Sequence, residues 1–403
     1  MVTLSNAENA LKTIYLGAVT ELLNTKVNPL LGKIEQSSVD VWGKEVRTAA
    51  RVGINGGIGA GDETGALPSA YGSNYVQFVS TLKNLYGQIE ISDKAIRASA
   101  DGRGAFTDLL NAELESLLSA SKFNLGRMLY GDGSGKLCVV GAVSSGFYPV
   151  DDTRNLIEGM VVDVYAAAGT LTCAGLRISY VDRDNKKIKF ASEPSATIAA
   201  SSVMYVQGSK DKEITGLGAL FDSSKTLYGL TRASYPFLTP YAQSDVGEID
   251  EIKIQKAIDR LEYNANSTVN YIAVAADVKY AYQQYMKQFK SNVEVMELEG
   301  GYKTLSYNGI PFVYDRFIES GAMYLLDTTA FKLHQLCDWR YLENENGKIL
   351  RQTQGKPTYT ATLVKYCDLI CSRPNGQAKL TGITAPSTAP STATTPSGND
   401  NNG

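Results

Sequence analysis

The chain has 403 residues, of which 43% are hydrophobic and 20% are charged, and its formal net charge is −3. This length allows about two or three domains, and this composition is ordinary for a soluble globular protein. The sequence has no dense block of lysine and arginine and no apolar run of about 18 residues, so we expect neither a nucleic-acid-binding arm nor a transmembrane helix.

Residues that could bind a metal or carry out catalysis are sparse. The chain has five cysteines, no Cys-x-x-Cys pair and a single histidine, His334. A structural zinc site takes about four such ligands, so we expect no metal and no cofactor. Reduced, buried thiols in a cytosolic environment are the preferred interpretation of the cysteines. The first residues lack the basic and apolar regions of a signal peptide.

The N-terminal region is predicted to be an arm with one amphipathic helix at residues 5–24. Ser5 and Glu8 fit a capping box, and apolar residues follow at helical spacing. The segment after it alternates only loosely, as an extended chain would. We therefore interpret residues 1–60 as an arm that packs on another surface.

Residues 61–92 are predicted to form a long two-stranded hairpin, entered through a glycine-rich stretch at 53–65. Each arm of roughly 12 residues would reach about 40 Å. Because an isolated hairpin is only marginally stable in water, we expect it to lie on a neighbouring copy of the same chain. This feature indicates a protein whose function is assembly.

A long helix is predicted from Phe106 to Tyr130, where leucines and other apolar residues keep a helical stripe. Its length would be about 37 Å. The glycines of 131–135 end it. Residues 147–214 then change to short β-type runs joined by polar turns, which predicts a small all-β barrel or sandwich inserted into the surrounding fold.

The remaining chain returns to a mixed α and β pattern. A compact α/β domain is predicted from the helices at 248–265 and 277–290 and the strands at 270–275, 309–313 and 322–327. Long strands follow at 335–381. The C-terminal tail is low in complexity and nearly uncharged, so we expect it to be disordered or a linker.

Two short motifs carry a resemblance. Glu63-Thr64-Gly65-Ala66-Leu67-Pro68 resembles the entry to the extended loop of tailed-phage major capsid proteins of the Hong Kong 97-like fold. Tyr307-Asn308-Gly309-Ile310-Pro311-Phe312-Val313, followed by Asp327, resembles the axial-domain signature of that family. The order of the predicted elements is also similar, and because the arm begins almost at residue 1, the chain is most similar to the group without a fused scaffolding segment.

This resemblance implies an α+β fold with a spine helix, a peripheral domain and an axial domain, to which the β segment is added. The implied segments are the N-terminal arm (1–60), the extended hairpin loop (61–92), the peripheral domain with the spine helix (93–146), the inserted β-domain (147–214), the axial α/β domain (215–334), the return strands of the peripheral domain (335–382) and the disordered tail (383–403).

The resemblance also implies a function. The chain would be a non-enzymatic major capsid protein that self-assembles, through pentamers and hexamers, into the icosahedral shell of a double-stranded DNA tailed bacteriophage. Its expected partners are other copies of itself, a portal protein, scaffolding or decoration proteins, and packaged DNA held by non-specific contact, with no membrane. It would be made in the cytoplasm of the host bacterium and located in the virion capsid.

Assembly contacts are expected from residues of the predicted hairpin. They are Glu63, Leu67, Pro68, Tyr71, Lys83 and Tyr86. Some members of the family crosslink their subunits through a lysine–asparagine isopeptide bond. The resemblance places Lys83 where such a lysine would lie, but no motif identifies its partners, and a surface contact is the preferred interpretation.

Three local patterns favour an ordinary structural role over chemistry. Residues 131–137 differ from a phosphate-binding loop, because Leu137 replaces the required hydroxyl residue and a helix precedes the loop. Asp182 and Asp184 lack the glycine and glutamate of a calcium loop, so we expect a β-turn. His334 and Cys337 would point to opposite faces of a strand, which is poor geometry for a base and a nucleophile.

Two functions of other classes stay open on the residues alone. One is a virion decoration protein or a receptor- or carbohydrate-binding protein, in which the β segment is the functional module. The other is an enzyme with a carboxylate site. Neither needs a long hairpin with a glycine-rich hinge, so the shell protein is the preferred hypothesis.

Overall fold

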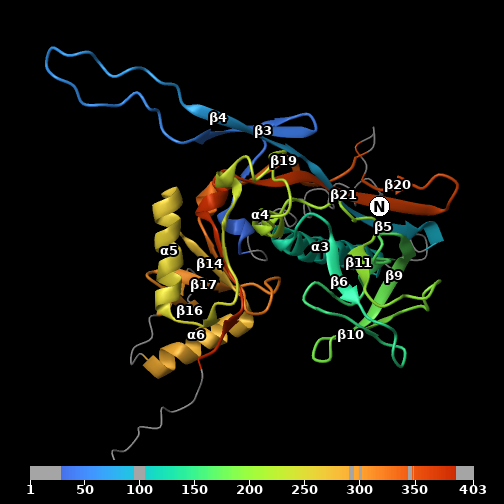
Figure 1. The fold of residues 1–403 in the computed structure, drawn as a ribbon. Coiled ribbons are helices and arrows are strands. Elements are labelled where there is room, and N and C mark those ends of the chain that lie inside the picture. Colours follow the sequence, from blue (N-terminus) through green and yellow to red (C-terminus); the bar gives the residue numbers. More distant parts are fainter. Residues whose placement is uncertain are drawn as a thin grey trace, which may run out of the picture.

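The computed structural model describes residues 29–94, 105–289, 295–298, 302–343, 347 and 349–386. The predicted helix at 5–24 and the tail beyond residue 386 lie outside the described residues. Three bodies and one projection make up the described fold: a peripheral sheet with the spine helix, an axial α/β domain, a β-barrel and a long hairpin (Figure 1).

The spine helix α3 (Ala105–Tyr130) confirms the predicted long helix almost to the residue. Its 26 residues span about 39 Å. Leu114, Leu118, Leu125 and Leu129 are buried at spacings of four, seven and four, so they form one apolar stripe. The helix ends before the turn at 131–135, where Gly133 and Gly135 take the left-handed conformation that favours glycine.

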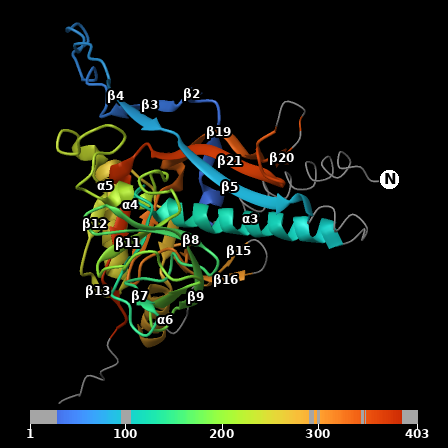
Figure 2. The ribbon, with the colours of Figure 1, turned by 90° about the vertical axis from the view of Figure 1, so that its right-hand side faces the viewer.

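A mixed sheet built on three long antiparallel strands, with one short strand added in parallel, lies along the spine helix (Figure 2). Its members are β1 (Glu35–Ser37), β5 (Lys83–Ser92), β19 (Phe331–Tyr341), β20 (Arg351–Gln352) and β21 (Thr358–Cys371). The central strand, β21, pairs with β19 on one side and with β5 on the other. A Cβ on Gly87 of β5 would lie 2.9 Å from Leu117 of the helix, so this glycine allows the strand and the helix to approach closely.

The hairpin lies earlier in the chain than we predicted. Its two arms are β3 (Glu45–Val52) and β4 (Asn74–Thr81), with β2 (Val41–Trp42) beside β3. The two strands of the predicted 61–92 hairpin pair elsewhere, β4 with β3 and β5 with β21. Only Leu82 separates β4 from β5, so the sequence reads as a single run although the chain changes sheets there.

A closed β-barrel follows the spine helix. Its strands are β6 (Lys136–Val140), β7 (Tyr148–Pro149), β8 (Val161–Tyr165), β9 (Leu171–Asp182), β10 (Lys187–Phe190) and β11 (Ser202–Val206). They pair in the order β6-β11-β8-β9-β10-β7, and a bridge between Val140 and Val150 closes the circle. The barrel begins at residue 136 rather than the expected 147, because Leu137, Cys138 and Val140 point into its own apolar core.

The axial domain is built on a mixed sheet of β12 (Tyr241–Gln243), β22 (Ala378–Leu380), β18 (Met323–Leu326), β14 (Tyr271–Val274), β17 (Ile310–Tyr314), β16 (Tyr302–Tyr307) and β15 (Val295–Leu298). The helices α5 (Glu251–Ala265) and α6 (Ala276–Phe289) pack beside it, and these helices with β14, β17 and β18 confirm the α/β prediction (Figure 1). Asp250 caps α5 by accepting a hydrogen bond from the Lys253 backbone nitrogen at 2.6 Å.

The C-terminal strands depart from the prediction. β22 joins the axial sheet rather than the peripheral domain, and β23 (Ile383–Thr384) pairs in parallel with β13 (Gly247–Glu248). Ile383 is buried, so the first residues of the expected tail are structured. The short elements that complete the fold are α4 (Leu217–Phe221) and the 3-10 turns η1 (Leu31–Lys33), η2 (Pro236–Leu238), η3 (Thr328–Ala330) and η4 (Pro374–Gly376).

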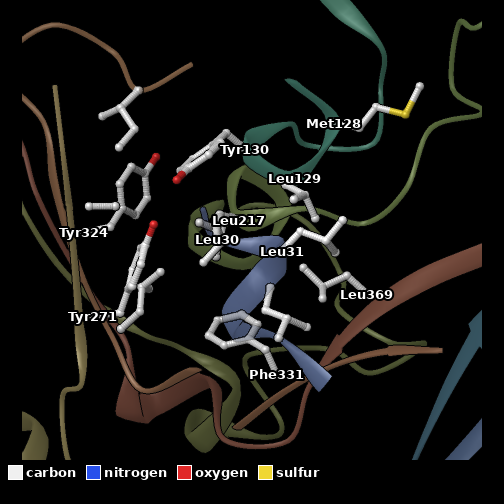
Figure 3. Packing of buried hydrophobic residues seen from close by; sticks show 14 of the residues in the cluster. Leu30, Leu31, Met128, Leu129, Tyr130, Leu217, Tyr271, Tyr324, Phe331 and Leu369 are labelled. Atoms are coloured by element: carbon white, nitrogen blue, oxygen red, sulfur yellow. The ribbon is translucent and has the colours of Figure 1, made fainter. Parts of the chain in front are cut away.

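One apolar core joins the peripheral and axial parts, whereas the barrel has its own. At the end of the spine helix, Tyr130 packs against Tyr324 of the axial sheet with ring centroids 5.9 Å apart. Leu30 and Leu31 fill the space between them and the peripheral strands (Figure 3). The helix, the peripheral sheet and the axial sheet therefore pack as one continuous unit.

Candidate assembly surface

The hairpin continues beyond its paired strands as a narrow ribbon. A Cβ on Gly57 would lie 3.3 Å from the backbone nitrogen of Tyr71, and one on Gly59 would lie 3.1 Å from Pro68. Toward the tip, the backbone nitrogen of Gly65 donates to the carbonyl oxygen of Asp62 at 3.1 Å, which forms a turn. Glycines on one side of the ribbon thus allow its outgoing and returning segments to lie against each other as far as this turn.

Large apolar side chains are exposed along the hairpin. Trp42 is 81% exposed and Leu67 is 90% exposed. Others with most of their surface in water are Val39, Ile54, Ile58, Tyr71 and Tyr75. Exposed apolar side chains along one projection are typical of an interaction site, because water contact with so much apolar surface is unfavourable. We name residues 39–75 the hairpin surface.

Four of the expected assembly residues lie on this surface. Glu63 is in the turn at the tip, and Leu67, Pro68 and Tyr71 lie on the returning side of the ribbon; all four are exposed. The sequence interpretation missed Trp42, Ile54 and Ile58, because it placed the hairpin too late in the chain, and it did not select Tyr75 although this residue lies within the predicted 61–92. Two isoleucines set among the glycines of 54–59 are the signal that could have found Ile54 and Ile58.

The other two expected residues are not part of the hairpin. Lys83 is half-buried at the start of β5, opposite Cys367 of β21. Tyr86 is exposed on the same strand, and its ring meets Tyr366 edge-on at 6.3 Å. The placement of Lys83 in the hairpin is therefore wrong, because the residue belongs to β5 of the peripheral sheet.

Buried contacts fix the hairpin and the segment after the barrel to the body. After the barrel, Glu213 accepts two hydrogen bonds from Arg127 of the spine helix, at 2.5 and 2.9 Å, and both side chains are almost fully buried. At the hairpin, Phe78 packs against Tyr228 with centroids 5.3 Å apart. These contacts hold both projecting parts in defined positions.

The structure also shows the roles of the sequence motifs that resembled phosphate-binding, calcium-binding or catalytic sites. Residues 131–135 form the turn between α3 and β6, and Asp182 accepts hydrogen bonds from Asn185 in the turn between β9 and β10. His334 is buried on β19, and burial lowers its pKa. Within the described ranges, no cluster of three metal-ligating side chains is found, and no helix there has the length and apolar character to cross a membrane.

Comparison with known proteins identifies this architecture. No protein family profile matches the chain, and no curated protein matches it. Among solved structures, the Cyanophage A-1(L) capsid asymmetric unit superimposes with a TM-score of 0.53 at 12% identity, over 88% of this chain and 90% of that one. The chain has the Hong Kong 97-like capsid fold.

Two further solved structures are similar at lower scores. The capsid of a native GTA particle has a TM-score of 0.47 at 11% identity, covering 90% of this chain and 91% of that one. The holo-SrpI encapsulin complex from Synechococcus elongatus PCC 7942 has a TM-score of 0.47 at 10% identity, covering 91% and 95%. The assignment of the Hong Kong 97-like capsid fold rests on the cyanophage structure. The N-terminal arm and the status of the barrel as an insertion stay predictions.

Proposed function

We propose that this chain is the major capsid protein of a double-stranded DNA tailed bacteriophage and assembles into its icosahedral shell. The observation that carries the proposal is the hairpin surface, which exposes Trp42, Leu67 and their apolar neighbours on a projection of a chain with a capsid fold. A side chain such as leucine or isoleucine contributes about 1.5–3 kcal/mol when a partner buries it fully.

Repetition makes such contacts effective. Every subunit of a closed shell both offers its hairpin and receives one, so modest contacts are multiplied by closure. The net charge of −3 fits a shell that is filled after it forms, because condensing a genome during assembly requires basic arms. We propose copies of this chain, arranged as pentamers and hexamers, as the main partners, with a portal, scaffolding or decoration proteins and non-specifically held DNA as the others.

The alternative, in which the barrel makes the chain a decoration or receptor-binding protein, has one supporting observation. The barrel is a closed unit with its own apolar core. Its attachment favours a role within the shell subunit instead, since the buried Arg127–Glu213 pair fastens the segment that follows the barrel to the spine helix. A tethered binding module would not need a buried ion pair at its base.

The test is to express the chain alone and with candidate scaffolding proteins, and to image the large particles by negative-stain electron microscopy. Closed shells, tubes or capsomer rings are the expected products. A matched variant replaces residues 53–73 by Asn-Gly, which joins the paired ends of β3 and β4 through a two-residue turn. This variant should stay soluble and fail to close shells, and normal shells from it would contradict a role for residues 53–73 of the hairpin surface, which include Leu67.

A further inference from the structure

The direction of the hairpin is set at one buried position. The chain passes from β4 to β5 through Leu82 alone, yet β4 pairs with β3 and β5 pairs with β21. Leu82 is buried, and its backbone nitrogen donates to the carbonyl oxygen of Lys44 at 3.0 Å. The contacts of the β4 residues just before Leu82 therefore determine the direction in which the hairpin leaves the body of the subunit.

A fully buried carboxylate lies beside this position. Asp368 of β21 accepts a hydrogen bond from the Ser80 hydroxyl, which belongs to the hairpin strand β4. The same carboxylate accepts from the backbone nitrogen of Thr215 at 2.6 Å and from its hydroxyl at 3.1 Å. Thr215 follows the barrel, two residues after the Glu213 that pairs with Arg127. We name Ser80, Thr215 and Asp368 the hairpin junction.

Apolar contacts support this junction at Phe78, which is buried on the same face of β4 as Ser80. Phe78 is buried between Tyr228 and Phe237, with ring centroids 5.3 and 6.4 Å away. The backbone nitrogen of Val79 donates to the carbonyl oxygen of Tyr228 at 3.1 Å. The Tyr228 hydroxyl in turn accepts from the backbone nitrogen of Cys371 at 2.8 Å. Alternate residues of β4 thus contact different segments of the body.

We propose that Asp368 is a positioning residue that fixes the direction of the hairpin and links it to the segment leaving the barrel. A buried carboxylate is costly unless hydrogen bonds satisfy it. If the hairpin swung away, Ser80 would leave and the carboxylate would lose a donor where no bulk water can replace it. A pair of apolar residues would pack there at less cost, but it would not select one direction.

The consequence for assembly rests on the proposed function, whereas the positioning itself does not. A hairpin that must reach a neighbour gains from being held in one direction before contact, because less motion is then lost on binding. Asp368 contributes this order in the free subunit. Ser80 of the hairpin and Thr215 of the barrel exit, the segment 207–216 that follows the barrel, also donate to the same carboxylate. A displacement of Thr215 would therefore change the position of the acceptor of Ser80.

The direction can be measured on the unassembled subunit by electron–electron double resonance. Spin labels are placed at Arg51→Cys on β3 and Lys256→Cys on α5, both exposed, in a Cys337→Ser background. The parent should give a narrow distance distribution. Ser80→Ala and Thr215→Val should broaden or shift this distribution. Ser80→Thr keeps a hydroxyl and should give the distribution of the parent. The matched control is Thr81→Ala, an exposed neighbour on the same strand, which should change nothing.

Hydrogen exchange supplies a second measurement that does not depend on the labels. Ser80→Ala should speed exchange of the β4 amides on the order of fivefold, as expected from the loss of one hydrogen bond, while amides of α5 keep their rates. Unchanged distances and unchanged β4 exchange in both Ser80→Ala and Thr215→Val would overturn the proposal. Because neither measurement uses shells, a failure of assembly with an intact junction would count against the proposed function alone.

Discussion

Buried charged residues lie where separate parts of this subunit meet. Arg127 and Glu213 join the spine helix to the barrel exit, with 3% and 2% of their side-chain surfaces exposed. A buried pair of this kind gives little net stability over an apolar pair, but removing one partner leaves an uncompensated charge. The pair is therefore stable only when both side chains are present and in contact, which favours a single geometry of the spine helix and the segment after the barrel.

Arg127→Met should lower the free energy of unfolding by about 3–5 kcal/mol, because Glu213 would stay buried without its cation. The double variant Arg127→Met/Glu213→Leu should recover most of that loss. Urea denaturation of the unassembled subunit measures both. The control is Arg183→Met, which breaks the exposed pair with Glu158 and should cost less than about 1 kcal/mol. Equal losses from the single and double variants would show that packing, not charge, dominates.

Asp315 is a second buried group, located where the axial sheet meets the spine helix. Burial raises its pKa, and a hydrogen bond from the backbone nitrogen of Phe317 opposes that rise. The charge of Asp315 also contributes to raising the pKa of the buried Tyr130 and Tyr271, after burial itself. The folded protein therefore holds the Asp315 proton more tightly than the unfolded chain does.

The sign of the pH dependence follows from that difference. The contribution of Asp315 to stability is complete below the unfolded pKa of about 4 and is lost as pH rises through the higher folded pKa. Asp315→Asn cannot ionise, so its unfolding free energy relative to the parent should rise across that window and then level off. Urea denaturation at a series of pH values measures the difference. A difference that does not vary with pH would show that folding does not raise the pKa of Asp315.

At the scale of elements, the barrel exit crosses the end of the spine helix at very close range. A Cβ on Gly216 would lie 2.6 Å from the carbonyl oxygen of Gly131 and 2.7 Å from that of Leu129. These are backbone atoms at the helix end, so they cannot move aside cheaply. The approach of the two segments thus depends on the absence of a side chain at one residue.

Gly216→Ala should destabilise the subunit by about 1–3 kcal/mol or more, because it overpacks a contact with rigid backbone. The matched control is Gly72→Ala in the hairpin, where a Cβ would meet nothing within 4 Å. Thermal unfolding of the two variants beside the parent gives the comparison. If both alanines had the same small effect, the close packing between the barrel exit and the helix end would be disproved.

The sequence predicted those elements whose signal is local. The apolar stripe of α3 and the alternation of helix and buried strand in the axial domain depend on periodicity alone, and the structure confirms them. Strand pairing depends on residues that are distant in the sequence, so local patterns could not predict which strands pair. β4 and β5 read as one run, and nothing near Leu82 reveals that β4 pairs with β3, 22 to 36 residues upstream, while β5 pairs with the C-terminal β21. Three of the four predicted assembly residues on the hairpin surface came from the motif at 63–68, whereas the junction around Asp368 joins three distant segments.

At the scale of the whole molecule, the chain returns to the axial domain before it leaves the described fold. β22 adds to the axial sheet beside β18, and β23 then pairs with β13. The backbone nitrogen of Ile383 donates to the carbonyl oxygen of Gly321 at 3.0 Å. The chain therefore joins the peripheral sheet and the axial sheet three times, between β5 and β12, between β18 and β19 and between β21 and β22, which limits how far either sheet can move alone.

The limit of the folded unit can be tested with two truncations. A chain ending at Pro386 keeps β23 and should unfold and assemble like the full chain. A chain ending at Gly382 lacks Ile383, which is only 6% exposed, and should lose roughly 1.5–3 kcal/mol of stability. Urea denaturation and particle imaging are applied to both. Ile383→Ser in the full chain is the matched control, and it should reproduce most of the loss, because the apolar contact and not the chain length is responsible. If the chain ending at Pro386 failed to assemble while staying folded, residues 387–403 would be a binding segment.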